Sequence, residues 1–218
     1  MSSDPATDSA SAQADFLLLI LSSPSGAGKT TLTARLRRTF PGLRFSVSHT
    51  TRRPRATEQD GREYHFVTRE EFRAMVASDC FVEWAEVHGN LYGTSVAEIE
   101  KARGTSEGVL FDIDYQGARQ IRARYPDAVS VFILPPSLQE LERRLRQRAS
   151  EDEVSLKTRL SAALGEIEHY GFFDYVVVND VLDLATRQLE SIVRAERCRR
   201  VRRARVAERM LLDARSAR

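Results

Sequence analysis

The stretch FLLLILSSPSGAGKTTL, residues 16–32, decides the fold of this chain. Its apolar start predicts a buried strand, and the spacing of Leu32, Leu36 and Phe40 predicts that a helix follows. A glycine-rich loop between such a strand and such a helix is the context of a phosphate-binding P-loop, because backbone N–H groups and the helix N-terminus can both face an anion. The loop is therefore a candidate site for the phosphates of a nucleotide.

Two glycines, a lysine and a threonine carry the chemistry of this loop. Lys29 is expected to reach the β- and γ-phosphates, and the Thr30 hydroxyl is expected to hold Mg²⁺. The P-loop pattern has a glycine where this chain has Ser23; since Gly26 and Gly28 remain, we expect Ser23 to be tolerated. The alternative is an ordinary glycine-rich turn with a surface lysine. The residues predicted to surround the phosphates are Ser25, Gly26, Ala27, Gly28, Lys29, Thr30 and Thr31.

Composition places the chain among soluble globular proteins. With 218 residues, 42% of them hydrophobic, it is long enough to form one domain with a substantial core. Cys80 and Cys198 have neither disulfide-framework nor zinc-site spacing. Residues 1–15 lack the basic start of a signal peptide, and the apolar run after them is too short to span a membrane. We therefore expect a disordered tail there and a cytoplasmic protein with no membrane partner.

Apolar strands alternate with amphipathic helices along most of the chain. This alternation predicts an α/β fold in which a parallel sheet lies between two layers of helices. The expected core strands are 16–21, 43–47, 109–113, 129–134 and 175–178. The expected helices are 30–38, 96–102, 117–125, 138–148, 153–170 and 182–193.

Residues 48–94 interrupt this alternation. Strands are expected at 64–67 and 81–87 and a helix at 69–77, whereas the polar stretch that follows Val47 has no clear period. Short strands around one helix are unlike a strand–helix–strand unit. We therefore predict a small mixed α+β region inserted into the core.

Three polar side chains are expected at one edge of the parallel sheet. Lys29, Asp112 and Asn179 each follow a core strand, and ligands of such sheets gather outside the carboxyl ends of the strands. Asp112 stands where P-loop proteins commonly hold Mg²⁺. The alternative is that a carboxylate at 112–114 caps the helix that follows.

Arginines cluster around Pro54. Arg52, Arg53 and Arg55 leave a short strand on a stretch that this proline stiffens. Their planar guanidinium groups suit a bidentate clamp on a second phosphate, and a solvated surface is the alternative.

A second group of arginines lies on two expected helices. Arg144 and Arg148 are four residues apart on one helix, and Arg159 lies on the next, a spacing that suits one anion held between the two. A solvated face on which Glu140 and Glu142 pair with these arginines explains the spacing equally well.

Seven ordered motifs extend the pattern along the chain. They are Ser48-x-x-Thr51-Arg52-x-Pro54-Arg55, Asp60-Gly61-x-x-Tyr64-x-Phe66, Glu83-Trp84-Ala85-Glu86, Gly89-Asn90-x-Tyr92-Gly93-Thr94, Asp112-Ile113-Asp114-x-Gln116-Gly117-Ala118, Pro135-Pro136-Ser137 and Val177-Val178-Asn179-Asp180. With them, the chain resembles the guanylate kinases from Phe16 to Val193, a far more specific match than a P-loop alone.

The resemblance implies that the insertion at 48–94 binds GMP. A carboxylate such as that of Glu83 can accept hydrogen bonds from N1–H and N2–H₂ of guanine, and the Ser48 hydroxyl can satisfy O6. Adenine lacks those two donors and would leave a buried carboxylate unpaired, which costs on the order of several kcal/mol. The residues that the resemblance assigns to GMP are Ser48, Arg52, Arg55, Tyr64, Glu83, Tyr92, Thr94, Asp112 and Asp114.

The resemblance also implies an ATP:GMP phosphotransferase. The γ-phosphoryl group of ATP would pass in line to GMP, and also to dGMP, with Mg²⁺ held by Thr30 and Asp112. Asn179 would lie at the adenosine end of ATP. The residues assigned to catalysis are Lys29, Arg52, Arg55, Arg144, Arg148 and Arg159. The domain would consist of a core at 16–47, 95–136 and 170–193, the insertion at 48–94 and a helical lid at 137–169.

Two other functions are alternatives to this one. A non-catalytic guanylate-kinase-like interaction domain is disfavoured because Lys29, Thr30 and Asp112 are all present. A kinase for another nucleoside monophosphate is disfavoured by Glu83 together with Ser48.

Residues 194–218 extend past the resemblance and are rich in arginine. A weak apolar stripe of Cys198, Val201 and Met210 predicts a helix. A solvated helix or a homo-oligomer contact is favoured for this segment over electrostatic binding to nucleic acid.

Overall fold

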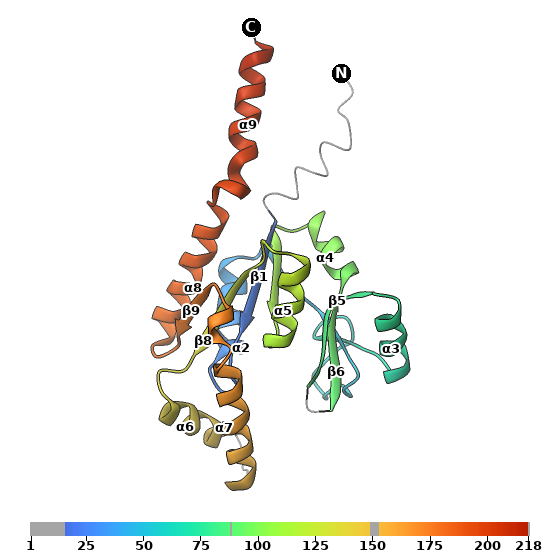
Figure 1. Cartoon of the computed structure of the whole chain (residues 1–218), viewed down its shortest axis with the longest axis vertical. Helices are drawn as coiled ribbons and strands as arrows, with labels where there is room; N and C mark the ends of the chain where they lie inside the picture. The colour runs from blue at the N-terminus through green and yellow to red at the C-terminus, as the bar shows by residue number, and fades with distance from the viewer. Residues whose placement is uncertain (1–15, 88, 149–152, 218) are drawn as a thin grey trace.

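The computed structural model describes residues 16–87, 89–148 and 153–217, and the tail expected at 1–15 lies outside them. Two β-sheets and the helices around them make up the described part of the chain (Figure 1). None of the helices in that part is long and apolar enough to cross a membrane.

The larger sheet contains five parallel strands in the order β2–β7–β1–β8–β9, as the alternation of strands and helices predicts. These strands are β1 (Leu17–Ser22), β2 (Leu43–Phe45), β7 (Gly108–Asp112), β8 (Val129–Leu134) and β9 (Tyr175–Val178). β1 lies at the centre and is buried along its whole length. Because both faces of this sheet are covered, its central strand is a continuous apolar run.

Helices cover both faces of the sheet and complete a three-layer core. Successive side chains of a strand point to opposite faces, so Leu19 and Leu21 join one core cluster and Leu18 and Ile20 the other. The first cluster is closed by α2 (Lys29–Thr39) and α8 (Leu182–Arg197), and the second by α4 (Val96–Arg103) and α5 (Tyr115–Arg124).

Four further strands form a separate mixed sheet in the order β4–β3–β6–β5. They are β3 (Ser48–Thr50), β4 (Tyr64–Phe66), β5 (Phe81–Val87) and β6 (Asn90–Ser95), and α3 (Arg69–Ala77) packs on them through Phe72. The mixed α+β character expected of this region is confirmed.

Two of these four strands, β3 and β6, are absent from the sequence prediction. The stretch after Val47 has no clear period because β3 is only three residues long and polar. β6 contains Gly93, which weakens strand propensity. Both strands exist because β6 pairs with β3 on one side and with β5 on the other, so tertiary pairing overrides the local signal.

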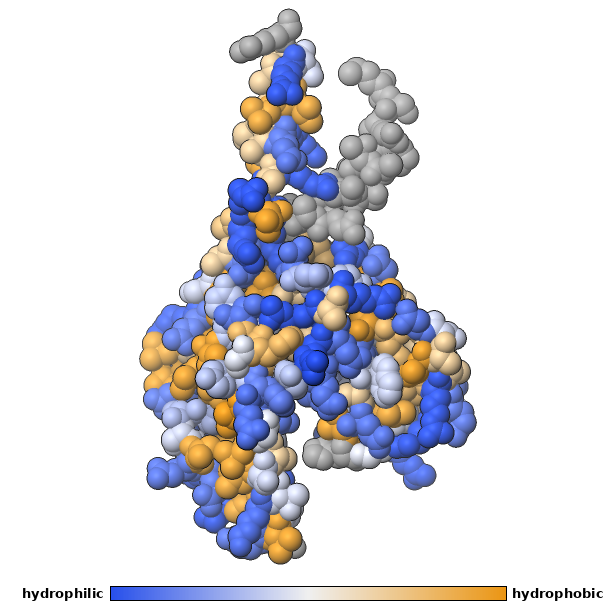
Figure 2. Space-filling view, in the orientation of Figure 1, coloured by the Kyte–Doolittle hydropathy of each residue, from blue (hydrophilic) through white to orange (hydrophobic). Residues whose placement is uncertain are grey.

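A pair of helices extends from the carboxyl end of the central sheet. α6 (Leu138–Arg148) and α7 (Glu153–Ile167) pack through Leu141, Leu145 and Leu156. α7 ends before the predicted Tyr170 because a 3₁₀ turn forms there. Figure 2 shows that the molecular surface is hollowed between this helix pair and the four-stranded sheet.

The C-terminal part of the chain is helical beyond the predicted end at Val193. α8 continues to Arg197, and its buried Glu196 accepts a hydrogen bond of 2.6 Å from the Tyr175 hydroxyl. α9 (Arg200–Ser216) confirms the predicted helix, and it extends away from the body of the molecule (Figure 1).

One arginine attaches the start of α9 to the core. Arg202 is buried and donates to the carbonyl oxygens of Phe16 at 3.0 Å and Asp127 at 2.9 Å. Beyond it, α9 exposes large apolar side chains, including Val206, Met210 and Leu211.

Candidate functional site

The P-loop joins β1 to α2 and folds as the sequence predicts. Gly26 and Gly28 have φ angles of 92° and 94°, in the left-handed region that glycine enters without a steric penalty. Gly28 directly precedes α2, where no side chain caps the helix, and Thr30 and Thr31 lie exposed in its first turn. The helix N-terminus is thus left to an external anion.

Lys29 faces the carboxyl end of β7. Its Nζ lies 2.5 Å from Asp112 Oδ1 and donates to the Ile113 carbonyl at 3.3 Å. Asp114 instead caps α5, because its Oδ1 accepts from the Gly117 amide at 2.9 Å. The capping alternative therefore applies to Asp114, and the assignment of Asp112 to Mg²⁺ stays a prediction.

Asn179 and Arg144 both attach to the P-loop. The buried Asn179 donates from Nδ2 to the Ala27 carbonyl at 2.8 Å. Arg144 donates to the Asn179 carbonyl at 3.0 Å and to the Ala27 carbonyl at 3.4 Å. Its Nε also binds Glu140 at 2.7 Å, so the carboxylate partner considered in the sequence is present as well. Arg144 thus links α6 to the phosphate loop.

The sequence analysis assigns two further arginines to the helix pair, Arg148 and Arg159. Arg148 ends α6, and its side chain lies outside the described part of the chain. Arg159 lies partly buried on α7. Glu166 of the same helix accepts from the Ser25 amide of the P-loop at 3.1 Å. Sequence reasoning missed Glu166, because nothing local links residues 141 positions apart.

A cavity of about 210 Å³ lies where the two sheets meet. Both sheets contribute residues that the sequence assigns to one site. Those that line the cavity are Lys29, Asp112 and Asp114 from the edge of the central sheet, and Ser48, Tyr64, Glu83 and Tyr92 from the insertion. The structure therefore brings together residues separated by up to 85 positions in the chain.

Glu83 is buried in this cavity with only 4% of its surface exposed. The pKa of its carboxyl group is raised to about 7, mainly by burial and to a smaller extent by the nearby Asp114, although hydrogen bonds from Thr94 oppose the rise. The Thr94 hydroxyl is also 3.2 Å from the Ser48 hydroxyl, so these three side chains form one polar cluster. A carboxyl group with this pKa gains or loses its charge near neutral pH.

Arg52 stands at the rim of the cavity. Its guanidinium lies 5.4 Å from the centre of the Tyr64 ring, and it donates to both carboxylate oxygens of Glu58 at 2.8 and 3.0 Å. The Glu58 hydrogen bond raises the pKa of Arg52. Arg55 is exposed and donates to Glu58 only through its backbone amide, at 2.8 Å. Glu58 is a further residue that the sequence analysis missed.

The family model for guanylate kinase matches residues 17–196, which is most of the chain. The chain belongs to the guanylate kinase family. Guanylate kinases of Geobacter metallireducens and Cereibacter sphaeroides are 51% and 54% identical to it, over 85% of this chain and 92% and 89% of theirs. The crystal structure of guanylate kinase from Anaplasma phagocytophilum superposes with a TM-score of 0.70 at 34% identity, covering 87% of this chain and 90% of that one.

A relative from Anaeromyxobacter dehalogenans extends the comparison. This guanylate kinase is 51% identical over 95% of the chain, a span that has to include part of the arginine-rich segment after residue 193. That segment is therefore shared with at least one other member of the family.

Two residues of the chain position Glu83: Gln120 escaped the sequence analysis, and Gly117 entered it only as part of a motif, with no role. Gln120 of α5 accepts from the Trp84 amide at 3.1 Å and donates to the Trp84 carbonyl at 2.7 Å, which holds β5 beside the helix. Gly117, on the same helix, lies so close that an added Cβ would stand 2.7 Å from Glu83 Oε2. A side chain at position 117 would therefore force the Glu83 carboxylate to shift.

We expect Gly117→Ala to raise the KM for GMP at least tenfold while the KM for ATP stays unchanged, because the new methyl group displaces the Glu83 carboxylate. Steady-state kinetics with each substrate varied in turn measures this split. Gly165→Ala is the matched control, since an added Cβ on that helical glycine meets nothing within 4 Å. An unchanged KM for GMP in Gly117→Ala would contradict the placement.

Ser23 is the one position where the P-loop departs from the common pattern. Among the described non-glycine residues only Asp79 has a positive φ, so Ser23 adopts no backbone conformation that requires glycine. Its hydroxyl donates to the Pro24 carbonyl at 3.1 Å. We expect Ser23→Gly to change kcat/KM less than tenfold in a coupled ADP assay, and a larger gain would contradict this.

Proposed function

We propose that the chain catalyses transfer of the γ-phosphoryl group of ATP to GMP, and to dGMP, giving ADP and GDP. The observation that carries this proposal is the cavity in which Glu83, Ser48 and Tyr92 of the insertion face Lys29 and Asp112 of the P-loop core. GMP bound in that cavity would lie beside Lys29, the side chain expected to bind the β- and γ-phosphates of ATP. The relatives named guanylate kinase support the same activity.

Guanine recognition rests on the polar cluster at the closed end of the cavity. The Glu83 carboxylate would accept from N1–H and N2–H₂, and the Ser48 and Thr94 hydroxyls would serve O6. The Tyr64 and Tyr92 rings, whose centres are 5.9 Å apart, line the cavity, and Arg52 lies beside the Tyr64 ring. Arg52 and Arg55 would bind the GMP phosphate, with Arg52 exchanging its Glu58 partner for that phosphate.

The reaction needs no general base, because the attacking oxygen of GMP already carries charge. Its barrier arises from the approach of two polyanions, so positioned positive charge is the main contribution of the protein. Lys29, Arg52, Arg144, Arg148 and Arg159 would supply it.

The residues of the P-loop edge also fit a magnesium ion that accompanies ATP. The described residues contain no cluster of three or more His, Cys, Asp or Glu side chains that could hold a metal alone. Mg²⁺ at nucleotide sites uses one or two protein oxygens and completes its shell with phosphate and water. Thr30 and Asp112 can supply these two, and the ion would neutralise phosphate charge.

The helix pair α6–α7 would act as a lid. Arg144 of α6 already contacts the P-loop. Glu166 of α7 accepts the hydrogen bond from the Ser25 amide, which a phosphate oxygen would accept when ATP is bound. Exclusion of water by such a lid would suppress ATP hydrolysis.

A coupled assay of ADP formation tests the proposal. ATP and Mg²⁺ are supplied with GMP, dGMP, AMP, CMP or UMP, and turnover is expected with GMP and dGMP. Absence of turnover with GMP would refute the proposal and leave the alternative of a non-catalytic interaction domain. Preference for another monophosphate would refute the assignment of Glu83 and Ser48.

A further inference from the structure

A large cavity outside the site already described is lined almost entirely by basic and apolar side chains. It measures about 1,020 Å³ and lies between the outer side of α2, the strand β2 and the loop that precedes β4. Among the described residues that line it, five are arginines and none is an aspartate or a glutamate. These arginines are Arg35, Arg37, Arg38, Arg44 and Arg62. We call it the α2 groove.

Two of the five arginines keep their positive charge uncompensated. Arg37 and Arg38 make no ion pair with any described residue, and the Arg37 guanidinium lies 4.7 Å from the centre of the Phe45 ring in the groove wall. The other three are paired by carboxylates that do not line the groove. Those carboxylates are Asp183 for Arg35, Glu98 for Arg44 and Glu63 for Arg62.

A role in stabilising α2 explains only part of this arrangement. Arg37 and Arg38 lie in the last turn of the helix, where a positive charge favours the helix dipole. Arg44 lies on β2 and Arg62 on the loop of the other sheet, and neither belongs to the helix. Four cations from three separate elements that face one cavity point to a ligand rather than to a helix end.

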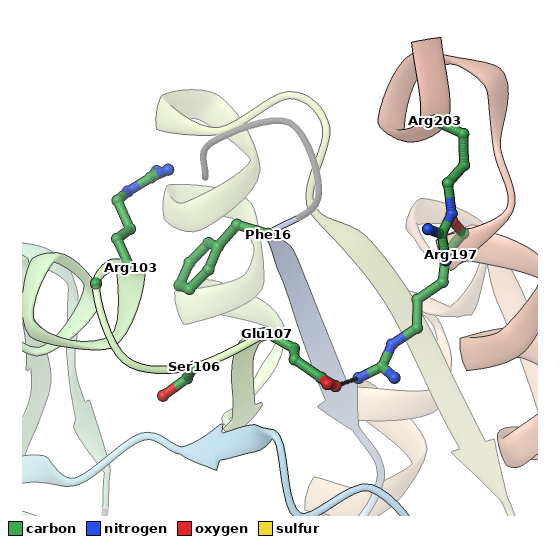
Figure 3. A pocket seen from close by; sticks show the side chains of 7 residues that line it. Phe16, Arg103, Ser106, Glu107, Arg197 and Arg203 are labelled. Carbon is green, nitrogen blue, oxygen red and sulfur yellow. Dashed lines mark hydrogen bonds and ion pairs between the residues drawn. The ribbon is translucent and has the colours of Figure 1, made fainter. Parts of the chain in front are cut away.

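A second basic cavity of the molecule differs in its charge. It lies at the amino end of β1 and has a volume of about 460 Å³ (Figure 3). Figure 3 shows that Glu107 reaches into this cavity toward Arg197, and their ion pair measures 2.7 Å. A carboxylate in the lining opposes an anion, so the α2 groove is the better anion site.

We propose that the α2 groove binds a small polyanion that carries two or more phosphate groups. Guanidinium groups bind phosphate oxygens in a bidentate fashion, and the groove is large enough for a nucleotide with its phosphates. Phosphates bound by Arg37 and Arg38 would be shared with Arg44 and Arg62, so the ligand would join the two sheets. The groove reaches Thr31 at the start of α2, but its arginines lie away from the P-loop: Arg37 follows Lys29 by eight residues, roughly 12 Å along the helix.

Binding of tripolyphosphate to the full chain without Mg²⁺ tests this proposal. The measurement uses Lys29→Met, which weakens the P-loop site and leaves the groove, and isothermal titration calorimetry reports affinity. We expect the addition of Arg37→Ser and Arg38→Ser to weaken binding at least tenfold. Chemical shifts of the wild-type backbone amides of Arg38, Phe45 and Arg62 should move on titration.

The matched control carries Lys29→Met with Arg209→Ser and Arg215→Ser, two exposed arginines of α9, so that it loses the same charge. Equal affinity in this control and in the groove variant would overturn the proposal. A nucleoside triphosphate used in parallel identifies the source: tighter binding than tripolyphosphate indicates a nucleotide, and equal binding indicates that phosphate groups suffice. Failure of both to bind would also overturn the proposal.

Discussion

Glu83→Gln is expected to lower kcat/KM for GMP on the order of 10³-fold. The glutamine amide offers a donor where guanine also presents donors, and two hydrogen bonds to a charged acceptor are lost, each about 1.5–3 kcal/mol. Glu86→Gln on the same strand is the matched control, because Glu86 is exposed and, among the described residues, its side chain pairs only with Arg69, at 3.6 Å. Activity of Glu83→Gln close to that of this control would contradict the role of Glu83.

The same substitution is expected to stabilise the protein without ligand at alkaline pH. The folded pKa of Glu83 is about 7 and the ordinary value is 4.5, so the folded state holds a proton that the unfolded state releases between these pH values. Stability is therefore lost as pH rises from 4.5 to 7, by about 3 kcal/mol in all. Glu83→Gln should recover about this amount at pH 8 and nothing at pH 4.

Chemical denaturation of the ligand-free variants across pH 4–8 measures this difference. An equal free energy of unfolding for wild type and Glu83→Gln at pH 8 would show that Glu83 carries no burial penalty. The proposed recognition of guanine uses the ionised Glu83 carboxylate, so the affinity of the wild type for GMP is expected to be about tenfold weaker at pH 6 than at pH 8. Glu83→Gln should lose that pH dependence.

Most of the central sheet is predictable from the sequence because its signal is local. β1 is an apolar run next to a glycine-rich loop, and β8 and β9 form at the predicted residues. The polar strands β3 and β6 are not predictable in this way, since they depend on partners far along the chain. The local sequence pattern thus identifies strands with a continuous apolar run and misses polar strands that form only by pairing with distant strands.

The same distinction applies to the residues of the candidate site. Ser48, Tyr64 and Glu83 each lie in a recognisable motif, and the structure brings all three to one cavity. Gln120, which holds the strand of Glu83, and Glu58, which binds Arg52, have ordinary sequence neighbours, and their roles become visible only from contacts in space.

Gly28→Ala is expected to destabilise the protein by about 3 kcal/mol and to lower ATP turnover more than 10²-fold. An alanine at a φ of 94° is strained by about 1–2 kcal/mol. Its Cβ would overlap the buried Asn179 side chain, and the loss of a buried hydrogen bond such as that from Asn179 to Ala27 costs about 1–3 kcal/mol more.

A double-mutant cycle separates strain from clash. Asn179→Ala alone should destabilise the protein, whereas the Gly28→Ala/Asn179→Ala double mutant should be about as stable as Gly28→Ala, because the clash has already removed the contribution of Asn179. Gly104→Ala is the control, since its added Cβ meets nothing within 4 Å. Additive losses in the cycle would mean that Gly28 and Asn179 act independently, and the P-loop would then owe its shape to glycine φ angles alone.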